Sequence, residues 1–248
     1  MGVVTVVASG KGGVGKSTVS AGLGCALAEL GGTVLVIDGD AGLRNLDLIM
    51  GVASETVYDL SDVFAGRCVP AGAIYPSPLY AGVSVIPAPG KLEDLCTPSD
   101  MRRLCRGFAR YYDHVIVDCP AGVGRGFDAA TAGADRAVLV TTPDLVCARD
   151  AAIVGDLLTE REVPTRLLIN RLRAAPILRG RAPDIDAIID ATGVRLIGVL
   201  PEDERVSVAV ANGHPLPADG PTVQGLRRIA RRLSGEHVPL PNLARIAP

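Results

Sequence analysis

Aromatic residues are scarce in this chain. They make up 3% of its 248 residues, and tryptophan is missing altogether. Proteins that bind single-stranded nucleic acid without sequence preference stack the bases on aromatic side chains. The composition therefore argues against a function of that kind. The apolar residues, 48% of the chain, are mainly aliphatic, which is what buried parallel strands require.

Long apolar runs are also missing. The most apolar stretches are interrupted by charged residues such as Glu29, Asp135 and Glu160, and each falls short of the ~20 apolar residues that a membrane span needs. No basic segment precedes the apolar stretch at the N-terminus, so a secretory signal is not predicted. We expect a cytoplasmic protein, and the sequence leaves open its attachment to the inner face of the cell membrane.

The chain has little net charge and no recognisable cysteine motif. The 25 Lys and Arg residues nearly balance the 27 Asp and Glu residues, so no strong electric field attracts nucleic acid. The six cysteines show no CxxC pair and no metal-ligand spacing, and we expect reduced, mostly buried thiols. The spacing of Cys96, Cys105 and Cys119 also argues against an iron–sulfur electron-transfer ATPase.

Aliphatic strands alternate with amphipathic helical stretches along the chain. Strands are predicted at residues 3–8, 33–38, 82–86, 114–118, 137–142, 166–170 and 195–200. Helices are predicted at residues 16–30, 56–65, 98–111, 148–159, 183–191 and 222–233. This alternation is typical of an α/β domain in which helices cover both faces of a mostly parallel sheet.

A glycine-rich loop follows the first predicted strand and opens the first predicted helix. Residues 10–17 read Gly-Lys-Gly-Gly-Val-Gly-Lys-Ser and satisfy the pattern GxxxxGK[ST]. Glycines let the backbone N–H groups wrap a phosphate, and the helix N-terminus adds the positive end of its dipole. In such a loop Lys16 reaches the β- and γ-phosphates and Ser17 ligates Mg²⁺. The nucleotide-binding positions predicted here are Lys11, Gly12, Gly13, Val14, Gly15, Lys16, Ser17 and Thr18.

Two further predicted strands end in aspartate. The strand at 33–38 ends in Asp38, with Asp40 two residues later, and the strand at 114–118 ends in Asp118. In open α/β sheets, ligands bind at the carboxyl ends of the strands. An apolar strand that ends in aspartate suits a carboxylate that holds Mg²⁺ through water. Ser17 and Asp118 are predicted to bind the metal, and the family resemblance given below implies that Asp38 and Asp40 belong to the same metal site.

Several segments resemble the ParA/MinD group of P-loop ATPases. Residues 11–18, KGGVGKST, resemble the deviant Walker A box of that group, and residues 119–122, which follow Asp118, resemble its switch-II segment. The run GLRNLDLIMG at 42–51 is more characteristic of the septum-site branch than of the partitioning branch. The resemblance implies a single P-loop NTPase domain over residues 1–235.

The resemblance also implies individual roles. Lys11 would reach across an ATP-bound homodimer to the nucleotide of the partner subunit. Asp40 would orient the attacking water, and Asp38 would support the metal and phosphate region. Lys11, Lys16 and Asp40 are therefore the expected catalytic residues. The residues expected around the base are Asn170, Arg171, Pro201 and Asp203.

The function implied by the resemblance is a slow, Mg²⁺-dependent, partner-stimulated ATPase. It would use ATP and ADP as a dimeric switch in division-site placement, with MinC-like and MinE-like partners. The chain departs from many relatives at Gly124 and Arg125, where an acidic residue is usual, and at Cys119, where a small hydroxyl residue is usual.

Two alternatives are considered. A ParA-like partitioning ATPase would bind cargo or nonspecific DNA, and the arginines at 161, 166, 171, 173, 179 and 181 offer a modest basic stretch. The run at 42–51 argues against that alternative, and no specific nucleic acid is expected. A non-catalytic scaffold is disfavoured because all the phosphate-site residues are present.

The C-terminal region gives two expectations. The tail at 236–248 contains three prolines, so the sequence does not predict an amphipathic membrane helix there. In the helix at 222–233, a narrow stripe of Val223, Leu226, Ile229 and Leu233 is predicted to pack against the sheet. The arginines of that helix, at 227, 228, 231 and 232, are then left as a patch for lipid headgroups, DNA or a protein partner.

Overall fold

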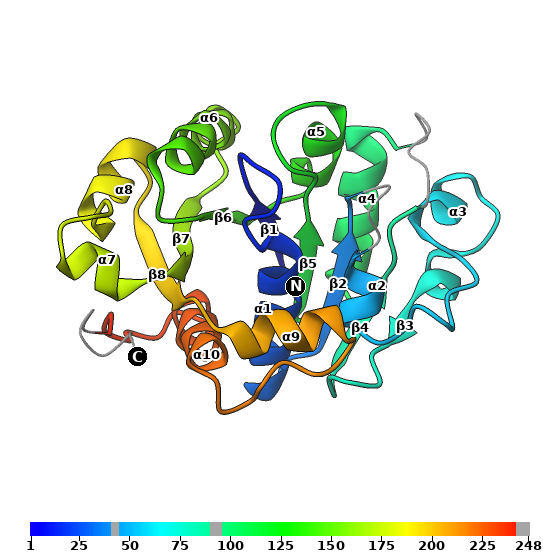
Figure 1. The fold of residues 1–248 in the computed structure, drawn as a ribbon. Helices are drawn as coiled ribbons and strands as arrows, with labels where there is room; N and C mark the ends of the chain where they lie inside the picture. Colours follow the sequence, from blue (N-terminus) through cyan, green and yellow to red (C-terminus); the bar gives the residue numbers. More distant parts are fainter. Residues whose placement is uncertain (41–44, 90–95, 242–248) are drawn as a thin grey trace.

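The computed structural model describes residues 1–40, 45–89 and 96–241. Its strands are β1 (Val3–Ala8), β2 (Val34–Asp38), β3 (Tyr75–Pro76), β4 (Val83–Ile86), β5 (His114–Asp118), β6 (Arg136–Thr141), β7 (Thr165–Leu172) and β8 (Leu196–Pro201). They form one sheet in the order β3-β4-β2-β5-β1-β6-β7-β8 (Figure 1). Neighbouring strands are parallel except for β3, which pairs antiparallel with β4 at one edge. The predicted mostly parallel sheet is confirmed.

Helices cover both faces of the sheet (Figure 1). One face carries α3 (Leu60–Phe64), the 3₁₀ turn η1 (Pro70–Ala73), α4 (Pro98–Phe108), α5 (Arg125–Thr131), α6 (Leu145–Glu160), α7 (Ala174–Leu178) and α8 (Ile185–Thr192). The other face carries α1 (Lys16–Glu29), α2 (Asn45–Ile49), α9 (Glu204–Ala211) and α10 (Pro221–Leu233).

Strand side chains alternate between these two faces. In β1, Val4 and Val6 belong to the buried cluster under α4, α5 and α6, whereas Val7 belongs to the cluster under α1 and α10. All three are fully buried. Because side chains along a strand point to opposite faces, a slip by one residue would exchange the two sets. The two cores therefore hold the strands in register, and this fixes which residues reach the carboxyl end of the sheet.

One predicted helix is much shorter than expected. The pattern at 56–65 predicts a helix, but the structure has only α3, because Asp59 caps its first turn by accepting from the N–H groups of Ser61 and Asp62. The N–H groups of Val57 and Tyr58 donate hydrogen bonds to the Tyr75 hydroxyl oxygen at 2.9 and 2.8 Å. The prediction was wrong for residues 56–59. The sequence patterns also missed η1, β3, α2, α5, α7 and α9.

The last helix packs as predicted, but its arginines do not form the predicted patch. Val223, Leu226 and Ile229 are buried against the sheet. Arg227 makes a two-pronged ion pair with Glu29 at 2.6 and 2.8 Å, and Arg231 pairs with Glu236 at 2.7 Å.

Arg232 binds the backbone of the chain itself. Its guanidinium donates to the carbonyl groups of Ile197, Val238 and Pro239. Three of the four arginines are thus engaged within the chain, and the prediction of an open patch was wrong for them. Among the residues that the structure describes, no helix is long and apolar enough to cross a bilayer.

Candidate active site

The glycine-rich loop between β1 and α1 takes the backbone conformation that its sequence predicts. Gly13 and Gly15 have φ angles of 80° and 90°, in the left-handed region that favours glycine. A Cβ atom at Gly15 would lie 2.4 Å from the Asn170 amide nitrogen, whereas one at Gly12 or Gly13 would meet nothing within 4 Å. The loop is therefore closed on the side of β7 and open on the side where a phosphate would lie.

Lys16, at the first position of α1, is buried among carboxylates. Its Nζ atom lies 3.0 Å from Asp118 Oδ1 and 3.5 Å from Asp40 Oδ2. Burial alone would lower the pKa of Lys16, but the neighbouring Asp118 and Asp40 carboxylates outweigh it and hold the pKa above its ordinary value. The lysine stays charged and is pre-positioned at the helix N-terminus.

Asp118, at the end of β5, is fully buried. Its Oδ1 accepts from Lys16 and from the Ser20 hydroxyl at 2.9 Å. Its Oδ2 is buried and has no hydrogen-bond partner among the described residues. Burial raises the pKa of Asp118, while Lys16 and then the hydroxyls of Ser17 and Ser20 act in the opposite direction. An orphaned carboxylate oxygen beside Ser17 fits a hard cation, which prefers oxygen ligands.

Asp38 and Asp40 take different places. Asp38 Oδ1 accepts from the Asp40 N–H at 3.0 Å and Oδ2 from the Leu46 N–H at 3.4 Å, so this side chain binds the backbone of both residues. Burial and then the Asp118 charge raise the pKa of Asp38 to about 7. Asp40 is partly exposed and faces Lys16. Residues 42–44 of the predicted run at 42–51 lie outside the described residues.

No preformed metal cage accompanies these aspartates. Within the described ranges, no group of three or more His, Cys, Asp or Glu side chains is arranged to hold a metal ion by itself. Mg²⁺ is commonly held by one or two carboxylates together with substrate phosphates and waters. The arrangement of Ser17 and Asp118 fits that kind of site, in which the nucleotide completes the coordination.

Lys11 lies at the exposed rim of the loop. Against the effect of burial, hydrogen bonds from the Cys147 N–H and the Thr142 hydroxyl hold the pKa of Asp144 below its ordinary value, and the charge of Lys11 makes a smaller contribution in the same direction. Asp144 caps the N-terminus of α6. The structure thus places Lys11 beside the start of α6 and away from the buried Lys16.

The residues predicted around the base do come together. A pocket of about 380 Å³ opens beside the glycine-rich loop. Its lining includes Gly15, Thr18, Asn170, Arg171, Pro201 and Asp203. The Asn170 amide donates to the Val14 carbonyl at 2.8 Å, which joins the end of β7 to the loop. Arg171 has a φ angle of 56°, at an irregularity in the β7–β8 pairing, and such strain often accompanies functional sites.

Two contributors to the site were missed by the sequence patterns. Ser20 binds Asp118, and its position one helical turn after Lys16 was a signal that could have found it. Helix α9 forms a wall of this pocket beside the loop through Val206, Ser207 and Val210. Its alternating valines resemble a strand, so the periodicity gave no helical signal.

The remaining predicted features have structural roles. Cys119 is fully buried, and burial raises the pKa of its thiol far above the ordinary value, so the thiolate needed for reactivity is not formed. In the basic stretch, Arg161 pairs with Asp128 at 2.5 Å and Arg173 pairs with Glu202. These contacts within the chain reduce the surface offered to DNA.

Comparison with known proteins agrees with this geometry. The sequence profile of the CobQ/CobB/MinD/ParA nucleotide-binding domain matches residues 5–216. The chain belongs to this family. The septum site-determining protein MinD of Bacillus subtilis is 39% identical over 246 residues, which cover 97% of this chain and 92% of the relative. MinD of Thermotoga maritima is 37% identical over 248 residues, which cover 98% and 92%.

Solved structures give the same result. The MinC:MinD cell division protein complex of Aquifex aeolicus superposes with a TM-score of 0.90 at 35% identity and covers 97% of this chain and 98% of that one. MinD of Pyrococcus horikoshii, complexed with Mg-ADP, gives a TM-score of 0.84 at 30% identity, with coverage of 94% and 96%. The chain is therefore a MinD-like member of the family and a nucleotide-binding NTPase.

Proposed function

We propose that this protein hydrolyses ATP with Mg²⁺ and acts in the placement of the division septum, the role named for its MinD relatives. One observation supports the proposed hydrolysis of ATP with Mg²⁺. Lys16, buried where the glycine-rich loop ends and α1 begins, is paired with Asp118, whose second oxygen lacks a partner among the described residues. The site holds groups for both a phosphate and a cation.

Each residue then has a defined task. The N–H groups of residues 12–15 bind the phosphates, and Lys16 exchanges its carboxylate partners for phosphate oxygens. Ser17 and Asp118 would hold Mg²⁺, which supplies positive charge to the phosphate oxygens. Asp40 positions the attacking water, and Asp38 holds the backbone of Asp40 in place.

The base would occupy the pocket beside the loop. Asn170 fixes the pocket wall through Val14 and presents its amide group to the base. Asp203 lines this pocket and would accept a hydrogen bond from an amino group of the base. Arg171 and Pro201 also line this pocket.

A homodimer is proposed as the ATP-bound state. Lys11 is exposed at the rim, and exposed apolar side chains lie close to it at the start of α6, where Leu145 and Val146 are 49% and 61% exposed. Val123, in the segment after Asp118, is 55% exposed. Apolar residues around an exposed lysine suit a face that a second subunit covers, where Lys11 would reach the partner's nucleotide. The complex of the Aquifex relative with MinC supports a MinC-like partner, and a MinE-like protein is the proposed activator.

Analytical ultracentrifugation tests the dimer. With Asp40→Ala to slow hydrolysis, we expect a dimer in Mg-ATP and a monomer in Mg-ADP. Lys11→Ala in the same background should remain a monomer, while Arg228→Ala, at an exposed site on α10, should dimerise normally. In the otherwise native chain, Lys11→Ala should lower ATP turnover by about 10²-fold, the usual cost of losing one charge-stabilising donor. If ATP produces no dimer and Lys11→Ala leaves turnover unchanged, the switch mechanism is wrong.

The proposed place of action is the cytoplasm, and a second assay addresses the membrane. Sedimentation with anionic phospholipid vesicles, in ATP and in ADP, is run beside a salt-titrated binding assay with random-sequence duplex DNA. Pelleting in ATP alone would show that the ATP-bound form binds an anionic lipid surface. Salt-sensitive DNA binding would instead favour a partitioning role.

A further inference from the structure

A buried hydroxyl group beside the phosphate loop has no task in the proposed hydrolysis of ATP. Ser20, in the second turn of α1, is fully buried, although serine side chains mostly lie at protein surfaces. Its Oγ atom lies 2.9 Å from Asp118 Oδ1 and 3.1 Å from the Lys16 carbonyl oxygen. A hydroxyl so close to the carboxylate that would hold Mg²⁺ can influence how that carboxylate meets the cation.

The spacing along α1 brings two donors to one oxygen of Asp118. Lys16 and Ser20 are four residues apart, so their side chains lie on the same face of the helix. Lys16 Nζ lies 3.0 Å from Asp118 Oδ1, the same oxygen that Ser20 contacts. Asp118 Oδ2 is buried and has no hydrogen-bond partner among the described residues. The carboxylate is therefore held by one oxygen, and the other oxygen is left for a ligand.

The single hydrogen of the Ser20 hydroxyl has two acceptors within reach. A serine hydroxyl donates one hydrogen bond, so the two acceptors compete for it. The Lys16 carbonyl oxygen also accepts the Ser20 backbone N–H in the regular pattern of an α-helix. An ionised carboxylate is the stronger acceptor, and the contact with it is the shorter of the two. Ser20 Oγ therefore donates to Asp118 Oδ1.

Nucleotide binding changes the partners of Asp118 but leaves this hydrogen bond in place. In the proposed function, Lys16 exchanges its carboxylate partners for phosphate oxygens, so Asp118 Oδ1 loses its cation. Ser20 has no part in binding the phosphates or Mg²⁺, and its place in α1 keeps it beside Oδ1. The terminal torsion of an aspartate side chain is broad and roughly two-fold, so a carboxylate without this donor could rotate.

We propose that Ser20 is a positioning residue for Mg²⁺. By holding Oδ1, it fixes the orientation of the Asp118 carboxylate and keeps Oδ2 available to the cation after Lys16 has turned to the phosphates. The inference rests on the proposed Mg²⁺-dependent ATPase function. It adds to the site a residue that contacts neither the nucleotide nor the cation.

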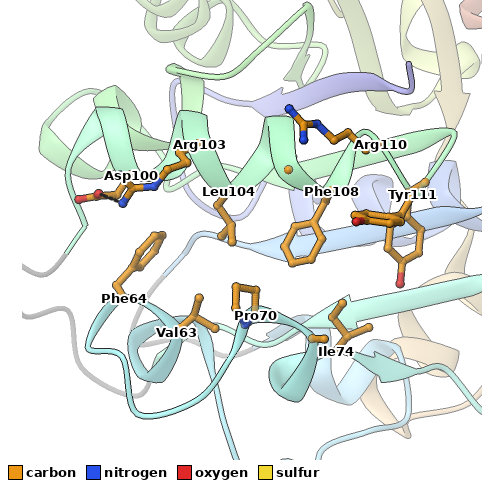
Figure 2. A pocket seen from close by; sticks show the side chains of 13 residues that line it. Val63, Phe64, Pro70, Ile74, Asp100, Arg103, Leu104, Phe108, Arg110 and Tyr111 are labelled. Carbon is orange, nitrogen blue, oxygen red and sulfur yellow. Dashed lines mark hydrogen bonds and ion pairs between the residues drawn. The ribbon is translucent and has the colours of Figure 1, made fainter.

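A set of variants separates this role from a general loss of stability. Ser20→Ala removes the hydroxyl, and Asp118→Asn removes the charge that would bind Mg²⁺. The double variant tests whether Ser20 acts through Asp118. Leu104→Ala is the control for lost stability, and it should destabilise the fold at least as much as the loss of one hydroxyl does. Leu104 lies on the opposite face of the sheet from α1, where it points from α4 into a cavity of about 850 Å³ (Figure 2).

The measurement is a titration of Mg²⁺ into the full chain with the fluorescent nucleotide N-methylanthraniloyl-ADP, beside binding of the same nucleotide in EDTA. We expect Mg²⁺ to tighten binding to the wild type. Ser20→Ala should need about fivefold more Mg²⁺ for half of this effect, as the loss of one hydrogen bond predicts. Its affinity in EDTA should stay within about twofold of the wild type, because the phosphate contacts are intact. Leu104→Ala should match the wild type in both measurements.

The double variant should need no more Mg²⁺ than Asp118→Asn alone, within about twofold. An undiminished effect of Ser20→Ala in that background would overturn the proposal, because Ser20 would then act on another group. Equal Mg²⁺ requirements in the wild type and Ser20→Ala would overturn it too, and so would a matching shift in Leu104→Ala. Binding weakened equally in Mg²⁺ and in EDTA would show a purely structural role. A wild type that binds the nucleotide equally well with and without Mg²⁺ would overturn the proposed function as well, whereas the other results leave that function standing.

Discussion

The aspartate side chains at the two ends of the sheet differ in how fully they are paired within the chain. At the carboxyl end, Asp38, Asp40 and Asp118 lie around a single cation, Lys16, in the part of the chain that the structure describes. The pKa of Asp38 is raised to about 7 by burial and by the Asp118 charge, and Asp118 keeps an oxygen without a partner among the described residues. Such an arrangement costs folding free energy, because buried carboxylates need compensating charge or hydrogen bonds.

At the amino end, the carboxylates are satisfied within the chain. Asp113 accepts from the Thr33 N–H and hydroxyl, both at 2.8 Å. Asp135 accepts from the Val4 N–H at 2.8 Å and pairs with Arg106 at 2.8 Å. The same residue type therefore stabilises the fold at one end and is left for ligands at the other. The surplus of negative charge identifies the functional end.

The largest effect is expected from Lys16→Ala. Among the described residues, Lys16 is the cation that pairs with Asp118 and Asp40, so the variant loses this compensating charge together with the proposed phosphate contact. ATP turnover, measured as phosphate release at saturating Mg-ATP, should fall by about 10²–10³-fold. Arg228→Ala should retain wild-type turnover. A Lys16→Ala protein that keeps more than a tenth of wild-type turnover would show that the charge at this end is not catalytic.

Asp135→Asn removes a paired carboxylate at the amino end of the sheet, where we expect a loss of stability and not of activity. The amide cannot both accept from Val4 and form an ion pair with Arg106, so the free energy of unfolding should fall by about 1–2 kcal/mol. ATP turnover should stay within about twofold of the wild type. Urea unfolding gives the stability, and the comparison of the two ends fails if turnover drops while stability is unchanged.

Asn170→Ala tests the hydrogen bond that connects the proposed base pocket to the glycine-rich loop. The variant loses the hydrogen bond to the Val14 carbonyl and leaves that acceptor without its donor. A loss of about 1 kcal/mol corresponds to roughly fivefold weaker ADP binding. Asn170→Asp should weaken binding further, since a carboxylate would repel the carbonyl and the phosphates. Calorimetric titration with ADP makes the comparison, and unchanged affinity in both variants would remove Asn170 from the site.

The smallest effect is a pH dependence at the amino end. Burial and then the charge of Arg136 lower the pKa of His114 below 6.5. The unfolded chain therefore takes up a proton first as the pH falls, so the contribution of this site to stability is complete above about pH 6.5 and is lost below it. His114→Gln should reduce the loss of stability between pH 7 and pH 5, by less than about 1 kcal/mol because the ring is only half buried. Exposed His214→Gln is the control, and identical pH profiles for both variants would contradict the assignment.

Local pattern was enough to predict much of the fold and the phosphate loop. The left-handed Gly13 and Gly15 and the helix that follows them are properties of neighbouring residues, so the sequence alone predicts them. The strand ends at Asp38 and Asp118 were also predictable, because an apolar run stops at each aspartate.

What the patterns missed depends on contacts between distant segments. Residues 56–59 are not helical because the Tyr75 hydroxyl accepts hydrogen bonds from the N–H groups of Val57 and Tyr58. Nothing within residues 56–59 indicates this contact. Helix α9 has a strand-like alternation and becomes a helix against the core and the base pocket. The choice of Asp118 as the main partner of Lys16 depends on the position of β5 beside β1 in the sheet.

The most direct test of the account is whether the unbalanced charge at the carboxyl end serves Mg²⁺ and nucleotide together. Calorimetry would compare ATP binding in Mg²⁺ and in EDTA for the wild type and for Asp118→Asn. We expect at least about tenfold tighter binding with Mg²⁺ in the wild type and the loss of most of that difference in Asp118→Asn. Equal ATP affinity in Mg²⁺ and in EDTA for the wild type would contradict it.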